Sequence, residues 1–236
     1  MECTFAVYRY DPAVDRKGRY QRYVVSAEST DKVLDCLNRI RWGQDPTLAF
    51  RASCAHGICG SDAMAINGRV ALACQKLVRD FNTANHFVIE PLPGFQVIKD
   101  LVVDLRPFFE KHRAVRPHLV THGEHPEKER RQSAENQQFI EPALRCILCA
   151  ACTASCPITR VNPKYLGPAA LLRAFRYICD SRDAITLERL RKLDDEDGIW
   201  GCETMWWCTD VCPKGIPVTK CLGQIKRLLK REDPSA

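Results

Sequence analysis

The chain has 236 residues, a formal net charge of +6 and 14 cysteines. This length suffices for one large or two small domains, and two cysteine groups with a polar stretch between them favour two. The N-terminal stretch MECTFAVYRYDPAVD lacks the apolar core of a signal peptide, so we expect a cytosolic chain with metal-binding or redox cysteines. No run approaches the roughly 18 apolar residues that span a bilayer, so any membrane role is expected to come through partners or a surface.

The first part of the chain carries the signals of a small α+β domain. Residues 4–10 and 20–26 are rich in Val, Tyr and Phe and flank the turn signal DRKG, which predicts a β-hairpin. A helix with apolar residues at helical spacing is expected next, capped by Ser29 or Thr30. Short strand patterns follow at residues 69–73 and 86–90.

Beyond residue 105 the pattern is mostly helical. The stretch from Thr121 to Gln138 is polar and charged, and is predicted to be a connector or a solvated helix. Pro168 is expected in the first turn of one helix, and two further amphipathic helices follow. Their apolar positions are Leu171, Leu172, Phe175 and Ile178; Leu187, Leu190 and Leu193; and Leu222, Ile225, Leu228 and Leu229. We therefore predict an α+β chain with two domains, residues 1–105 and residues 106–236.

A glycine-rich loop in the first domain is surrounded by Cys54, Cys59 and Cys74. The first two have the spacing with which the 2Fe-2S loop of plant-type ferredoxins begins, and the third position of that pattern is Asp62. A carboxylate is an anionic donor of similar reach to a thiolate, so Asp62 is expected to complete the ligand set. The alternatives are a surface Asp62 with Ser61 or water in its place, and a zinc site with three cysteines.

Two stretches of the second domain repeat one cysteine pattern: CILCAACTASCP at 146–157 and CETMWWCTDVCP at 202–213. In the bacterial ferredoxin run three thiolates hold one four-iron cluster, and the fourth belongs to the other cluster. In the second stretch Met205 occupies the place of a thiolate, and a thioether is a weak ligand, so we predict a 3Fe-4S cluster there. A zinc ribbon is the alternative. The expected ligands are Cys146, Cys149, Cys152 and Cys212 for 4Fe-4S, and Cys156, Cys202 and Cys208 for 3Fe-4S.

The basic surplus raises the question of nucleic-acid binding. An oxidised cluster with its thiolate ligands carries about −2, so three clusters bring the total charge near zero. The chain also lacks a basic stripe interleaved with aromatic residues. We therefore expect no nucleic-acid partner.

The chain resembles the iron-sulfur subunit of succinate dehydrogenase and fumarate reductase over nearly all of its length. The motifs that carry the resemblance are CGSDAM around Asp62, CILCAAC with Cys156-Pro157, NPKYLGPAA from Asn162, DSRD from Asp180, and the Cys-Pro-Lys-Gly that begins at Cys212. The resemblance implies an N-terminal β-grasp, plant-type ferredoxin domain followed by a mostly helical, bacterial-ferredoxin-like domain. It also implies that the three clusters relay electrons between a flavin, near the 2Fe-2S cluster, and a membrane quinone, near the 3Fe-4S cluster.

The same resemblance implies the partners. They are a flavoprotein subunit that holds FAD and membrane anchor subunits, whose haem content the sequence leaves open. With them the chain is part of a succinate dehydrogenase complex on the cytoplasmic face of the bacterial cell membrane, and it carries the clusters without the dicarboxylate site. The alternative is a soluble fumarate reductase, or another flavin-linked oxidoreductase, with a non-quinone acceptor.

The expected quinone site includes Pro157, Ile158, Met205 and Trp206. Trp206, like its neighbour Trp207, could instead pack under the cluster. Members that use ubiquinone often have tryptophans after the first Cys-Pro and a histidine after the first cysteine of the last run. Here the stretch after Pro157 has no tryptophan and the histidine position is Glu203, which favours menaquinone.

Overall fold

The computed structural model describes residues 1–81, 85–123 and 126–232. Contacts between residues divide the chain into two units. The first unit is Met1–Leu105 with Ile147–Ser155, and the second is Arg106–Cys146 with Cys156–Ala236. The segment that holds Cys149 and Cys152 therefore packs with the first unit, although it lies inside the second half of the sequence.

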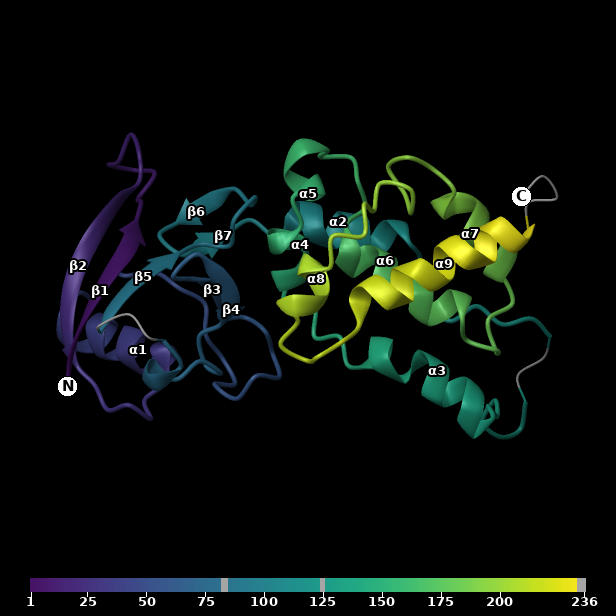
Figure 1. The fold of residues 1–236 in the computed structure, drawn as a ribbon, viewed down its shortest axis with the longest axis horizontal. Helices are drawn as coiled ribbons and strands as arrows, with labels where there is room; N and C mark the ends of the chain where they lie inside the picture. The colour runs from purple at the N-terminus through teal and green to yellow at the C-terminus, as the bar shows by residue number, and fades with distance from the viewer. Residues whose placement is uncertain (82–84, 124–125, 233–236) are drawn as a thin grey trace. The chain divides into compact units, whose positions relative to one another are not determined.

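A five-stranded mixed sheet forms the centre of the first unit, with the order β2-β1-β5-β3-β4 (Figure 1). Strand β1 (Glu2–Arg9) pairs antiparallel with β2 (Arg19–Ser26) and parallel with β5 (His86–Glu90). Strand β3 (Ala63–Ile66) joins β5 to β4 (Arg69–Leu72) by antiparallel pairing on both sides. Alternate residues of β1 are buried, as the two-residue period of a strand requires. The predicted hairpin and both predicted strands are confirmed.

Helix α1 (Val33–Gly43) packs against this sheet through a buried apolar face. The prediction that Ser29 or Thr30 caps the helix is wrong, because the N-cap is Lys32. Lys32 forms a bridge with Leu77, so the chain before the helix is held in an extended conformation. The Asp35 carboxylate then accepts the Lys32 amide at 3.0 Å and supports the first turn. A short strand pair, β6 (Val97–Lys99) and β7 (Val102–Val103), was not predicted.

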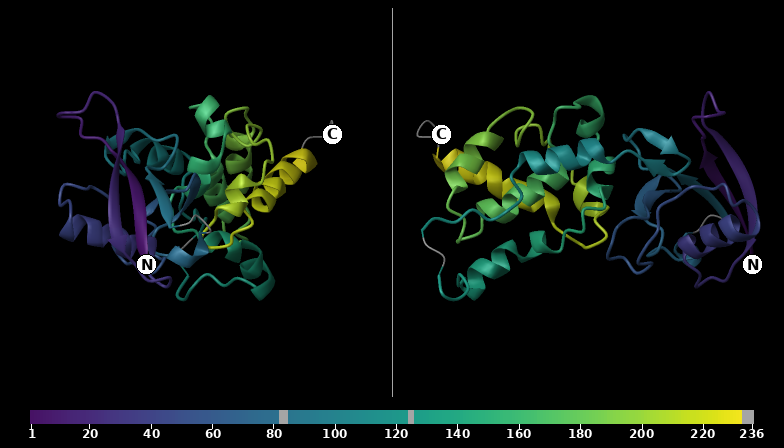
Figure 2. Two further views of the ribbon diagram at one scale, coloured as in Figure 1. Left: turned by 60° about the vertical axis from the view of Figure 1, so that its left-hand side comes forward. Right: turned by 180° about the vertical axis from the view of Figure 1, so that it is seen from behind.

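The second unit is helical, and α6 (Pro168–Ile178) is at its centre. It contacts α2 (Arg106–Ala114), α3 (Ala134–Leu144), α7 (Thr186–Leu193) and α9 (Val218–Glu232), and α9 runs beside it in Figures 1 and 2. The three predicted helices are α6, α7 and α9, so the predicted α+β fold is confirmed. The short helices are α4 (Ala151–Ser155) in the first unit, and α5 (Ile158–Val161) and α8 (Trp207–Asp210) in the second.

Most of the predicted apolar positions of these helices are buried. Leu171, Leu172 and Phe175 are at most 2% exposed. Leu187 has half of its surface exposed, and Leu228 is only partly buried. Steps of three residues drift by about 60° around a helix, which leaves the first turn of α7 outside the buried face.

The predicted connector is helical at its C-terminal end. Its residues 124–125 lie outside the described residues, and α3 begins at Ala134. The Ser133 side chain caps α3 by accepting the Asn136 amide at 3.2 Å. Among the helices of the described ranges, none combines the length and the apolar character of a membrane span.

Candidate functional site

In the loop before β3, backbone amides donate hydrogen bonds to the Cys54 sulfur. Its sulfur accepts the backbone amides of Ile58 at 3.4 Å and of Cys59 at 3.3 Å. Hydrogen bonding from the His56 backbone, together with these two amides, lowers the pKa of the Cys54 thiol to about 6. A thiol of this kind is mostly ionised at neutral pH, which is the form that binds iron.

Asp62 and Cys74 form a buried pair. Asp62 is 2% exposed, and its Oδ2 accepts the Cys74 amide at 2.5 Å. Its Oδ1 is buried and has no hydrogen-bond partner within the described ranges. Burial, and then the neighbouring carboxylate, raise the pKa of the Cys74 thiol to about 12. An orphaned carboxylate oxygen beside a buried thiol is costly alone, whereas iron bound to both groups would satisfy them, so these residues fit an iron-sulfur cluster.

Gly60 marks a close approach between this loop and the segment of residues 147–155 within the first unit. A Cβ atom at Gly60 would lie 2.6 Å from Cβ and 3.0 Å from Cα of Cys149. Gly60 also has φ of +69°, which glycine adopts without strain. The predicted 2Fe-2S loop therefore contacts one of the predicted 4Fe-4S ligands directly.

The two repeated cysteine stretches also repeat a backbone conformation. Leu148 and Ala150 have φ of 54° and 64°, and the residues 56 positions later, Thr204 and Trp206, have φ of 59° and 64°. Positive φ is unfavourable for such residues and persists only where the surroundings impose it. A short helix follows each loop, with Cys152 or Cys208 as its second residue. The sequence repeat is thus a repeat of local structure, as expected of two loops that wrap clusters.

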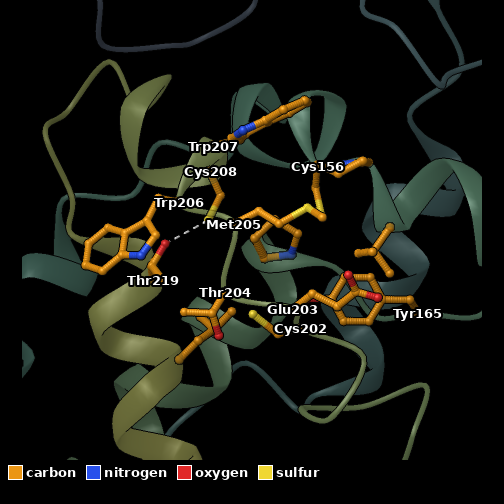
Figure 3. Close-up of a pocket in the computed structure, with 14 residues that line it drawn as sticks. Cys156, Tyr165, Cys202, Glu203, Thr204, Met205, Trp206, Trp207, Cys208 and Thr219 are labelled. Carbon is orange, nitrogen blue, oxygen red and sulfur yellow. Dashed lines mark hydrogen bonds between the residues drawn. The ribbon is translucent and has the colours of Figure 1, made fainter.

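In the second unit Cys156, Cys202 and Cys208 line one solvent-open pocket (Figure 3). Figure 3 shows Met205 among these three side chains. All three cysteines are partly buried, and burial raises the pKa of the Cys156 and Cys208 thiols. Three thiols around one space, with a thioether beside them, fit a cluster that has three thiolate ligands.

The predicted quinone-site residues line the same pocket. They are Pro157, Ile158, Met205 and Trp206. Met205 and Trp206 are each 45% exposed and Trp207 is 53% exposed, so neither tryptophan is fully packed under the pocket. Exposed large apolar groups around a pocket are typical of a surface that receives an apolar ligand or a partner.

Two buried residues of this pocket that carry hydroxyl groups were not predicted from the sequence. Tyr165 is 1% exposed and lies in the NPKYLGPAA motif, which gave a signal for the segment but none for a role. Thr219 is 4% exposed and lies in α9, where no motif marks it.

The remaining predicted ligands are divided between the two units. Cys149 and Cys152 belong to the first unit, whereas Cys146 and Cys212 belong to the second. All fourteen cysteines lie in the described part of the chain, and all are free. Within that part, no three His, Cys, Asp or Glu side chains converge as they would on a single metal ion.

Comparisons with known proteins agree with this arrangement. Residues 4–110 match the family model of a 2Fe-2S iron-sulfur cluster binding domain, and residues 142–216 match that of a 4Fe-4S dicluster domain. The succinate dehydrogenase iron-sulfur subunit of Coxiella burnetii is 40% identical over 235 residues, which cover 98% of this chain and 99% of that one. The corresponding subunit of Paracoccus denitrificans is 42% identical over 231 residues, covering 95% of this chain and 87% of that one.

A solved structure has the same fold over the whole chain. A chain of the Mycobacterium smegmatis Sdh1 complex in the apo form superposes with a TM-score of 0.91 and 28% identity, covering 100% of this chain and 99% of that one. These two relatives are 40% and 42% identical to this chain over at least 95% of its length. That sequence identity is higher than a shared fold alone requires. The chain belongs to the family of succinate dehydrogenase iron-sulfur subunits.

Proposed function

We propose that this chain is the electron-transfer subunit of a succinate:quinone oxidoreductase. It relays electrons between the FAD of a flavoprotein subunit and a membrane quinone, and the complex is the enzyme. The observation that carries the proposal is the pair of cysteine loops that repeat both sequence and positive φ, beside a separate plant-type loop. A bound iron-sulfur cluster accepts and passes on one electron at a time.

The ligand sets follow from spacing and from the contacts within each unit. We assign the 2Fe-2S cluster to Cys54, Cys59, Asp62 and Cys74, and the orphaned Oδ1 of Asp62 supports the carboxylate as a ligand. We assign the 3Fe-4S cluster to Cys156, Cys202 and Cys208, which line one pocket. The 4Fe-4S assignment to Cys146, Cys149, Cys152 and Cys212 rests on the ferredoxin spacing alone.

The quinone site is proposed at the pocket of the second unit. Pro157, Ile158, Met205 and Trp206 provide an apolar wall next to the proposed 3Fe-4S ligands. A quinone ring against this wall would be within short reach of the terminal cluster, and the exposed tryptophans would stack on the ring or on the anchor.

The type of quinone and the cellular location are also proposed. Glu203 lines the pocket where ubiquinone-using members often have a histidine, and menaquinone is the proposed acceptor. The partners are the FAD-containing flavoprotein and a membrane anchor, with or without haem, on the cytoplasmic face of the cell membrane. The relatives are named succinate dehydrogenase subunits, so a soluble fumarate reductase with a non-quinone acceptor is not favoured.

The test is expression with the flavoprotein and anchor genes, followed by electron paramagnetic resonance and activity measurements. We expect three cluster signals and succinate-dependent reduction of a naphthoquinone analogue with a higher kcat/KM than that of a ubiquinone analogue. If all three signals are present but succinate reduces neither quinone analogue, a quinone is not the acceptor. A colourless complex that contains zinc would refute the proposed clusters.

A further inference from the structure

The start of helix α1 contacts both of the segments that carry the proposed 2Fe-2S ligands. One segment is the loop that begins at Cys54, and the other is the chain around Cys74. Backbone amides of the first helical turn reach the second segment, and the side chain of Lys32, the N-cap residue, reaches the first. The role argued here for Lys32 rests on the proposed function, because it requires a cluster held by these two segments.

The first turn of α1 binds the chain on both sides of Cys74. The Val33 amide donates to the Lys76 carbonyl at 2.8 Å. The Leu34 amide donates to the Ala73 carbonyl at 3.1 Å. Both amides belong to the group that a helix leaves without intrahelical partners at its N-terminus. The N-terminus of α1, with its partial positive charge, is therefore fixed beside a proposed cluster ligand.

The Lys32 side chain binds the other ligand segment. Its Nζ donates to the backbone oxygen of Ala55 at 2.9 Å, one residue after Cys54. Ala55 has φ of 57°, a conformation that is unfavourable for alanine and persists where contacts impose it. The bond from Lys32 is such a contact. It holds the turn from which the amides of Ile58 and Cys59 donate to the Cys54 sulfur.

The ammonium group of Lys32 has no carboxylate partner within the described ranges. The two acidic residues nearest to it in the sequence are engaged elsewhere. Asp31 pairs with Arg39 at 2.5 Å, and the Asp35 carboxylate accepts the Lys32 backbone amide at 3.0 Å. The Lys32 side chain is partly buried, so solvent screens its charge less than that of an exposed lysine. An unneutralised positive charge therefore lies against the proposed cluster loop.

We propose that Lys32 joins the two ligand segments of the 2Fe-2S cluster and raises the reduction potential of that cluster. Reduction by one electron adds a negative charge to the cluster. A fixed cation, together with the N-terminus of α1, stabilises the reduced form more than the oxidised form. Lys32 is a positioning residue, because it binds the backbone of the loop and no proposed ligand side chain. In the proposed complex it makes the first cluster of the relay easier for the flavin to reduce.

The test is a potentiometric titration of the assembled complex, monitored by the paramagnetic signal of the reduced 2Fe-2S cluster. Lys32→Gln removes the charge and keeps a donor for the Ala55 carbonyl, so we expect an intact signal with a lower midpoint. Lys32→Arg keeps the charge and should have a midpoint near that of the wild type. The matched control is Lys17→Gln, which changes an exposed lysine between β1 and β2 and should leave the midpoint unchanged.

A second pair of variants separates the contact with Ala55 from the charge. Lys32→Met removes both the donor and the charge, so it should lose iron and lower the midpoint of the cluster that remains. Adding Ala55→Gly should restore the iron content but not the midpoint, because glycine adopts positive φ without strain. The midpoint of this double variant also decides the question if Lys32→Gln does not keep its cluster.

Three outcomes would overturn the inference. One is a Lys32→Gln complex with an intact signal and the midpoint of the wild type. Another is an equally lowered midpoint in Lys32→Arg, which would assign the effect to packing instead of charge. The third is loss of the cluster from Lys32→Gln, Lys32→Arg and the double variant alike, which would make Lys32 a structural support. A wild-type complex without a 2Fe-2S signal would instead refute the proposed ligand set, so the two failures can be told apart.

Discussion

At Asp62 the chain has a carboxylate where a thiolate is the ordinary cluster ligand. A carboxylate is a harder donor than a thiolate, and it binds iron less covalently. The structure supports the proposed ligand role, because one oxygen accepts the Cys74 amide and the other is buried and has no hydrogen-bond partner among the described residues. The Cys74 amide therefore orients this side chain, and its second oxygen is the one that we propose as the iron ligand.

The first prediction concerns this carboxylate. Asp62→Cys should retain the 2Fe-2S cluster with a changed midpoint potential. Asp62→Ala should bind much less iron than the about two atoms per chain expected at this site. Iron analysis and the spectrum of the reduced protein measure both effects. Ser61→Ala is the control and should keep its iron, because Asp62 and not Ser61 is the proposed ligand. Equal iron content and equal potentials in all the proteins would rule the ligand assignment out.

A second prediction at this scale concerns Gly60. Alanine at this position would meet Cys149 at 2.6 Å, so the loop or the segment of residues 147–155 must move. Gly68→Ala is a matched control, because Gly68 also has positive φ but nothing lies within 4 Å of an added Cβ. Both variants should lose about 1 kcal/mol from backbone strain. Only Gly60→Ala should also lose iron and slow the reduction of the 4Fe-4S cluster by the 2Fe-2S cluster. The same loss in both variants would show that strain, and not the contact, is responsible.

At the scale of elements, buried ion pairs hold the ends of helices in the second unit. Asp180 follows α6, is fully buried, and accepts from Arg176 at 2.7 Å and from both Nε and Nη2 of Arg182 at 2.8 Å. Burial alone would raise the pKa of this carboxyl, but the bonds from Arg182 and Arg176 outweigh it and lower the pKa to about 2. The DSRD motif is thus explained by packing.

The third prediction follows from this cluster of charges. Asp180→Ala should destabilise the chain by about 3 kcal/mol, because it leaves two guanidinium groups partly buried without a partner. The contribution of Asp180 should be complete above pH 4, near its unfolded pKa, and should disappear as the pH falls through about 2. Thermal unfolding of the variant measures the loss, with the exposed Glu196→Ala as control. A midpoint equal to that of the control would contradict the role of the pair.

The elements also show how much of the structure the sequence could predict. Long periodic segments such as α6 and α9 were predictable, because their buried residues recur at helical spacing. The short helices α4, α5 and α8 were not, because each has at most five residues and depends on the loops around it. The cysteine spacing predicted the three cysteines that line the terminal pocket, but Thr219 reaches Cys208 only through the packing of α9. A contact between distant segments leaves no local pattern.

At the scale of the whole molecule, the formal charge of +6 has to be considered together with the clusters. Each oxidised cluster with its thiolates contributes about −2, so the loaded chain is close to neutral. Lys226 illustrates how part of the basic surplus is used, since its ammonium group is bound to the carbonyl of a proposed ligand. This part of the charge excess therefore has a local structural use.

The last prediction concerns the iron content of the complete chain. With Met205 in the place of a fourth thiolate, the three clusters should contain about nine irons, and the terminal one should be paramagnetic when oxidised. Met205→Cys should raise the content to about ten and remove that signal, because the repeated loop conformation places position 205 where Cys149 lies in the first run. The new four-iron cluster should have a lower potential and slow quinone reduction. Met205→Leu is the matched control: it has no donor, so it should keep nine irons and the signal. A wild-type protein with about ten irons and no signal when oxidised would contradict the three-iron assignment.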